Sequence, residues 1–159
     1  MTLPAAFPLS MSQVATELGL SLPLSLSHAW VEALARKTAL PVSFSDLLGK
    51  TGRFDGNLTV HFTDGSTYAE IDTSLSFFNI SITAIYSSNA NGGQLGIFAT
   101  GTPPASISKV LLKNNTTGAS AVLGPPISGQ AWTATGVSNW NNIVRTSHIT
   151  DNFTILPST

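Results

Sequence analysis

The stretch SLSFFNISITAIY at positions 74–86 decides how this sequence is expected to fold. Apolar side chains recur there at every second position and alternate with polar or small residues: Phe78, Ile80, Ile82, Ala84 and Tyr86. A period of two places alternate side chains on opposite faces of a β-strand, so the stretch predicts one half-buried strand. The following SSNANGG, rich in glycine and asparagine, predicts a tight turn.

The same alternation extends on both sides, across residues 53–159. On the N-terminal side, RFDGNLTVHF and TYAEID flank the Asp-Gly of TDGS, which predicts a hairpin with Val60 and Phe62 on one face. On the C-terminal side, strand-like stretches recur about every ten residues: QLGIFAT, SISKVLLK, ASAVLG, QAWTATGV, NNIVRTSH and NFTILP. Short strands at such spacing predict a mainly β fold, an antiparallel β-sandwich of about 7–9 strands.

Residues 1–52 differ, because they contain three copies of a Pro-x-Ser-x-Ser pattern. PLSMSQ begins at Pro8, PLSLSH at Pro23 and PVSFSD at Pro41. Proline favours extended geometry, and the second serine of each copy stands where a helix N-cap belongs, before an amphipathic run. The sequence therefore predicts three short helices, the first of them ending at Gly19.

The second copy precedes the clearest helix, HAWVEALARKT, with an apolar stripe of Trp30, Val31, Leu34 and Ala35. Helices this short are marginal alone, so they must pack on each other, on the rest of the chain or on a partner. We expect residues 1–52 to be at least partly loose in the free subunit, because their apolar stripes are narrow and their helices short. An alternative is that the repetition merely reflects three good helix starts. The apolar residues of the copies are candidate assembly contacts: Met11, Val14, Leu18, Leu26, Trp30, Leu34, Phe44 and Leu47.

Composition narrows the class of protein. Only 9% of residues are charged and 42% are hydrophobic, against about 25% charged in ordinary soluble domains. No apolar run approaches the roughly 18 residues of a membrane-spanning helix, and the N-terminus lacks the pattern of a signal peptide. A net charge of −1 without a basic cluster disfavours nucleic-acid binding. Repulsion between like charges helps to keep free proteins apart, and this chain has few charges. The composition therefore favours a protein that works as part of a larger assembly.

The phrases PLSMSQVATELGL, LPLSLSHAWVEALARKT and PVSFSDLLGKTG, in this order, resemble a segment near the N-terminus of many tailed-bacteriophage virion proteins. Most of those are tail, tail-fibre or unspecified structural proteins, and the resemblance covers about positions 8–52. In many of them a long repetitive fibre follows, whereas here about 107 residues follow. A short adaptor, tip or decoration subunit suits that length better than a fibre shaft.

The resemblance implies a non-enzymatic structural protein of the virion, tail-associated, made in the host cytoplasm and partnered by other virion proteins. Virion proteins occupy rotationally repeated positions, so we expect a homo-oligomer, with a trimer suiting a fibre or tip. One alternative is a capsid decoration or cement protein. Another is a carbohydrate-binding module that recognises a host-surface glycan.

The chain offers no legible catalytic or metal site. His28, His61 and His148 have no second ligand at metal-binding spacing, and cysteine is absent. Two carboxylates could in principle hydrolyse a glycoside. Glu70 and Asp72 are two positions apart, however, which fits one solvated face of a strand better than a catalytic pair. We therefore expect no enzyme activity, cofactor or metal.

Two tryptophans are the candidate glycan contacts. Trp132 and Trp140 flank TATGVSN, and aromatic rings beside Asn and Thr can stack on a sugar. The alternative, that the rings fill the core or a subunit contact, is the stronger one.

Overall fold

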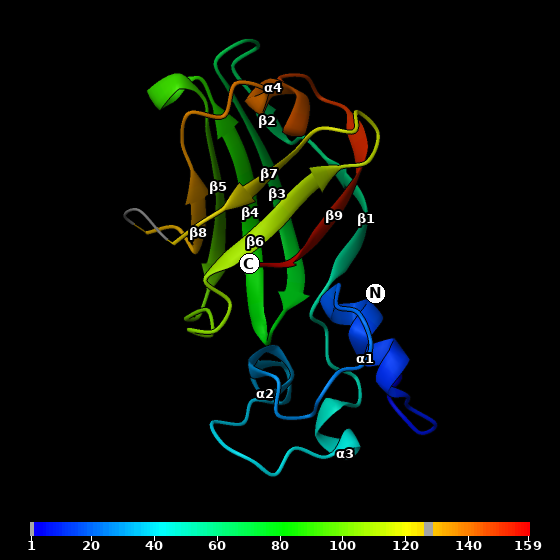
Figure 1. Cartoon of the computed structure of the whole chain (residues 1–159). Helices are drawn as coiled ribbons and strands as arrows, with labels where there is room; N and C mark the ends of the chain where they lie inside the picture. The colour runs from blue at the N-terminus through cyan, green and yellow to red at the C-terminus, as the bar shows by residue number, and fades with distance from the viewer. Residues whose placement is uncertain (1, 126–128) are drawn as a thin grey trace.

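A computed structural model of the chain describes residues 2–125 and 129–159. Within these residues, nine strands form two antiparallel sheets that face each other as a sandwich, ordered β1-β9-β6-β7 and β2-β3-β4-β5-β8 (Figure 1). The strands are β1 (Phe54–Thr59), β2 (Phe62–Thr63), β3 (Tyr68–Phe77), β4 (Ile80–Ser88), β5 (Gln94–Thr100), β6 (Lys109–Asn114), β7 (Ser120–Leu123), β8 (Trp132–Ala134) and β9 (Thr150–Ser158). The mainly β, sandwich-type prediction is confirmed.

The two sheets are joined along both sides. Between β1 and β2 the chain crosses from one sheet to the other: Val60 donates its N–H to the Ile149 carbonyl at 3.0 Å, and His61 donates to Glu70 of β3 at 2.9 Å. On the opposite side, an isolated bridge joins Gly124, after β7, to β8. These links join the two sheets at the β1–β2 crossing and at the β7–β8 bridge, while β2 pairs with only two residues of β3.

The stretch 74–86 forms a hairpin and not the single predicted strand. β3 ends at Phe77, β4 begins at Ile80, and Phe78 and Asn79 between them have φ of 47° and 65°. Two positive φ angles match the tight turn of a two-residue hairpin, which usually contains glycine. Here the Phe78 ring is buried edge-on against Phe77, with ring centroids 5.0 Å apart, so its burial offsets the unfavourable backbone.

A β-bulge between Ile82 and Ala84 reverses the faces of β4. Beyond it, Ile85 points into the core, whereas Tyr86 lies on the outer face with its ring over Gly96. The prediction that positions 78–86 share one buried face is wrong past this point, because one extra residue exchanges the faces of a strand.

Two further predictions are corrected. β1 pairs with β9, and only Phe62–Thr63 forms the predicted hairpin with β3, so Phe62 faces solvent while Val60 is buried. The stretch NNIVRTSH is not a strand, because Trp140–Ile143 form the short helix α4. This helix lies at the end of the sandwich opposite the N-terminal helices (Figure 1).

The three predicted N-terminal helices are present as α1 (Met11–Leu18), α2 (Ala29–Ala35) and α3 (Phe44–Leu47). α1 and α3 begin earlier than predicted, because the first serine of the copy is the N-cap: Ser10 N donates to Gln13 Oε1 and Ser43 N to Asp46 Oδ2, each at 2.8 Å. Gly19 ends α1 in the left-handed conformation, as predicted. No helix among the described residues is long and apolar enough to cross a membrane.

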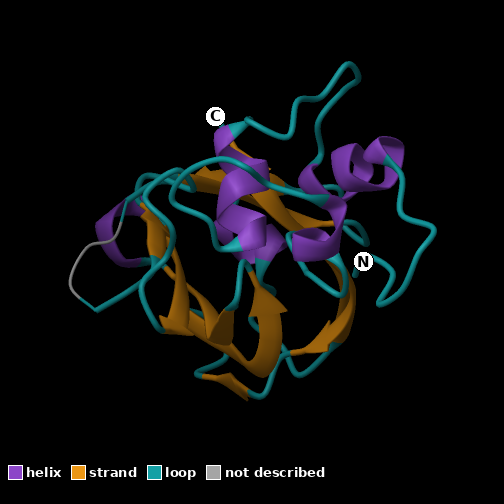
Figure 2. Ribbon diagram, turned by 90° about the horizontal axis from the view of Figure 1, so that it is seen from below, coloured by secondary structure: helices purple, strands orange, loops and turns teal. Residues whose placement is uncertain are grey.

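The N-terminal helices pack against one end of the sandwich (Figures 1 and 2). Glu17 of α1 is fully buried, and its Oε1 accepts the N–H of Gly52 at 2.7 Å and of Arg53 at 3.0 Å, where the chain enters β1. Burial raises the pKa of Glu17, against the opposing effect of these bonds. Trp30 of α2 donates its Nε1–H to the Ser106 carbonyl at 2.9 Å. One hydrophobic core therefore runs from the helices into the sheets.

Candidate functional site

The structure divides the eight predicted assembly contacts into two groups. Five are buried inside the chain: Val14, Leu18, Trp30, Leu34 and Leu47. They hold the helices to the sandwich, so a partner cannot contact them in this conformation. The other three, Met11, Leu26 and Phe44, are half-buried and occupy the same position in each copy, between the two serines.

In each copy, the residue that directly precedes the proline is large, apolar and exposed to solvent. Phe7 is 61% exposed, Leu22 56% and Leu40 55%, and the prolines themselves are also exposed. We call the pairs Phe7–Pro8, Leu22–Pro23 and Leu40–Pro41 the X–Pro corners. Covering an exposed apolar side chain with a partner lowers the free energy of the complex. The X–Pro corners are therefore candidate sites for protein contacts.

The three X–Pro corners also share a local structure. Each peptide bond before the proline is cis. The two serines of each copy are hydrogen-bonded through their hydroxyls: Ser10 to Ser12 at 2.9 Å, Ser25 to Ser27 at 2.7 Å and Ser43 to Ser45 at 2.7 Å. No charged residue lies between the exposed apolar residue and the second serine. The chain thus presents the same uncharged surface element three times.

A second feature is an open groove where the end of α2 meets the five-stranded sheet. Two adjoining cavities of about 450 and 440 Å³ share Arg36, Asn79 and Ile80 in their walls. Serine and threonine line the first cavity: Ser74, Ser76, Ser81 and Thr100. Among the described residues, no Asp or Glu lines either cavity. We call the two cavities together the seam groove.

Arg36 lines both cavities of the seam groove and has an unusual backbone conformation. It is the C-cap of α2 with φ of 60°, a position that usually favours glycine. Its Nη2 donates to the Asn79 carbonyl at 3.0 Å, and Asn79 Nδ2 donates to the Leu34 carbonyl at 3.3 Å. These bonds tie the end of α2 to the turn between β3 and β4, and the first of them holds one nitrogen of the exposed guanidinium.

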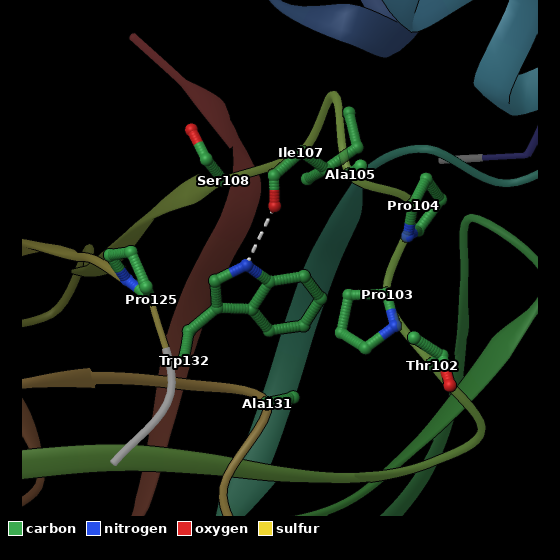
Figure 3. Close-up of a pocket in the computed structure, with 9 residues that line it drawn as sticks. All are labelled: Thr102, Pro103, Pro104, Ala105, Ile107, Ser108, Pro125, Ala131 and Trp132. Carbon is green, nitrogen blue, oxygen red and sulfur yellow. Dashed lines mark hydrogen bonds between the residues drawn. The ribbon is translucent and has the colours of Figure 1, made fainter.

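The two candidate glycan contacts are not brought together on a surface. Trp132 is 1% exposed, and its Nε1–H donates to the Ile107 carbonyl at 2.9 Å (Figure 3). Its ring lies edge-on to the ring of Phe77, with the ring centroids 5.7 Å apart. The neighbouring cavity of about 260 Å³, with Pro103 in its wall, has no charged side chain among its described lining residues. Trp140 is half-buried in α4 and packs on the core. Trp132 therefore acts as a core residue, which is the alternative that its sequence context left open.

Glu70, Asp72 and Asp64 do not line the seam groove, and each has hydrogen-bond or ion-pair partners elsewhere. Glu70 accepts the Tyr68 hydroxyl at 2.6 Å, and burial together with this bond raises the pKa of Tyr68. Asp72 pairs with His61 at 2.8 Å on the exposed face of the sheet. Asp64 accepts hydrogen bonds within its turn, from Thr67 above all, which lowers its pKa to about 2.

The other two histidines have local roles. His28 Nδ1 accepts the Trp30 N–H at 3.2 Å as the cap of α2, and a ring nitrogen of His148 lies 3.3 Å from the Val60 carbonyl. In the part of the chain that the structure describes, no group of three or more His, Cys, Asp or Glu side chains could hold a metal ion.

No protein-family model, curated protein or solved structure matches the chain. The sequence does contain a signal for the X–Pro corners, since a large apolar residue precedes each of the three prolines, although the repeat as defined begins at the proline itself. It contains none for Arg36, whose place in the seam groove depends on how α2 docks on the sheet.

Proposed function

We propose that this chain is a non-enzymatic structural protein of a tailed-bacteriophage virion, associated with the tail, which attaches to neighbouring virion proteins through its X–Pro corners. Three observations support the proposal: the resemblance of positions 8–52 to virion proteins, the low content of charged residues, and the repeated exposure of Phe7, Leu22 and Leu40. The exposure of Phe7, Leu22 and Leu40 is the decisive observation, because it gives each copy of the repeat an apolar surface that a partner can contact.

The energetics favour repeated attachment. Fully burying a Leu or Phe side chain stabilises by about 1.5–3 kcal/mol, and these three are already partly covered. Association itself costs roughly 4–15 kcal/mol, so three corners of a single chain give only a weak contact. A homo-oligomer, for example a trimer, presents several sets of corners at once and raises the overall avidity without new chemistry.

The test replaces Phe7, Leu22 and Leu40 together by serine and measures, by quantitative mass spectrometry, how much of the chain purified particles contain. We expect at least a tenfold loss with unchanged circular dichroism, because these side chains contribute little to the fold. The matched control replaces Phe62 and Val122, which are 52% and 45% exposed outside the N-terminal helices, and keeps incorporation normal. Normal incorporation of the triple variant would refute the attachment role.

Separating purified tails from purified heads decides the location. Recovery in tails fits the proposal, whereas recovery in heads favours the capsid decoration alternative. Glycan recognition through Trp132 and Trp140 is not proposed, because Trp132 is buried with its polar atom already bonded.

A further inference from the structure

We propose that the seam groove binds an anionic polyol, that is, a hydroxyl-rich molecule that bears a carboxylate or a phosphate group. The inference goes beyond assembly and holds whatever particle the chain belongs to. It depends on an exposed cation, a row of hydroxyls and a backbone with positive φ angles, which meet at the junction of α2 with the five-stranded sheet.

The cation is the guanidinium of Arg36. A guanidinium has five N–H donors, and within the described residues Arg36 donates one hydrogen bond, from Nη2 to the Asn79 carbonyl. The remaining donors are available in a groove whose described lining contains no carboxylate. A fork of parallel donors suits the paired oxygens of a carboxylate or phosphate. Lys37 at the rim adds positive charge, although it also pairs with Asp46 at 3.5 Å.

The hydroxyls form a row across three neighbouring strands. Ser76 of β3 pairs in register with Ser81 of β4, which pairs with Thr100 of β5, so the three side chains lie on one face of the sheet. Adjacent strands lie about 4.8 Å apart, so the row spans about 10 Å, comparable to one or two sugar units. A hydroxyl can both donate and accept, as the hydroxyls of a polyol require, although the Thr100 hydroxyl already donates to the Ser81 carbonyl at 3.4 Å. A purely inorganic anion would leave most of this row unused.

The backbone around the groove is held in a sparsely populated conformation. Of the four non-glycine residues with positive φ in the described chain, three are in the groove wall: Arg36, Phe78 and Asn79. A left-handed backbone costs roughly 1–2 kcal/mol for most L-residues and less for asparagine, and such outliers cluster at binding sites. Glycine would suit the end of α2 without this cost, but it would supply no guanidinium.

The test measures binding to the full chain by isothermal titration at low salt, with three probes: a trigalacturonate for the carboxylate, glycerol 3-phosphate for the phosphate, and lactose as a neutral polyol. We expect saturable binding of at least one anion and at least tenfold weaker binding of lactose. The anion that binds more tightly identifies the source of the charge. Raising the salt weakens the interaction, because the groove is open to solvent.

Two substitutions separate the site from the fold. Arg36→Gly relieves the positive φ and should weaken anion binding at least tenfold while the protein stays folded. Lys113→Gln removes the same charge on the exposed face of β6 and should leave binding unchanged. If Arg36→Gly lowers the melting temperature by more than a few degrees, Thr100→Val gives a second reading, with an expected loss of about threefold.

The proposal is overturned if neither anion binds at 10 mM, if lactose binds as tightly as the anions, or if Arg36→Gly binds them like the native chain. The serine variant of the three X–Pro corners should keep full anion binding. A failure of the attachment role and a failure of this inference are therefore distinguishable.

Discussion

Gly96→Ala is expected to destabilise the fold, although alanine is normally the better residue in a strand. At an open strand position the change stabilises by about 0.4–1 kcal/mol, because it restricts the unfolded chain. At Gly96 a Cβ would lie only 2.7 Å from Cζ of Tyr86, so the ring must move. Overpacking of this kind costs about 1–3 kcal/mol, which leaves a net loss of about 1–2 kcal/mol. For a chain of this size that lowers the melting temperature by about 2–8 °C.

Thermal unfolding followed by circular dichroism measures the effect. Gly124→Ala is the matched control, because the nearest atom to its Cβ is 4.0 Å away, and it should raise or preserve the melting temperature. In a Tyr86→Ala background, Gly96→Ala should become neutral or stabilising, since the clashing ring is gone. If Gly96→Ala instead stabilises the native chain as Gly124→Ala does, the outward position of Tyr86 and the bulge before it are wrong.

Three further predictions test the docking of the helices and the core. Leu34→Ala should cost about 2–5 kcal/mol and abolish the slow amide exchange that we expect at Val31 and Leu34; fast exchange of these amides in the native chain would show that the helices are not docked. Folding raises the pKa of Glu17 above its ordinary value of 4.5. The stability that its protonated carboxyl contributes is therefore fully present below pH 4.5 and is lost as the pH rises through the pKa of the folded state. Relative to the native chain, Glu17→Gln should therefore gain stability between pH 4 and pH 7 in urea unfolding, and a relative loss over that range would contradict the burial of the carboxyl. Trp132→Ala should cost about 3–5 kcal/mol in the same assay, clearly more than Trp140→Ala, and equal effects would argue against the core position of Trp132.

Local patterns were sufficient where one chemical cause dominates. The apolar stripe of α2 predicted four buried residues, Trp30, Val31, Leu34 and Ala35, and all four are buried. Gly19 ends α1 because a left-handed C-cap tolerates glycine best. β5 ends at Thr100 before GTPP, and β7 ends at Leu123 before Gly124–Pro125, because glycine permits turn conformations and proline lacks the N–H of a strand ladder.

Local patterns failed where a turn or a bulge lacked its usual residues. The Phe78–Asn79 turn contains neither glycine nor proline, so its alternating apolar neighbours resemble one continuous strand. The extra residue before Ala84 leaves no trace in composition, yet it moves Tyr86 to the outer face. The stretch 141–148 has a strand-like composition, but at the end of the sandwich its first residues form part of α4.

The sequence by itself determined the mainly β class, the three short helices and the repeated pattern before them, because these depend on periodicity and on residues with fixed backbone preferences. Only the tertiary structure decided which apolar residues are exposed. Val14, Leu18 and Leu34 are apolar in the sequence just as Phe7, Leu22 and Leu40 are, but the end of the sandwich covers the first three and leaves the others in solvent. The seam groove likewise exists only because docking brings Arg36 beside Asn79, 43 positions away in the chain, and burial of distant segments against each other has no local signature.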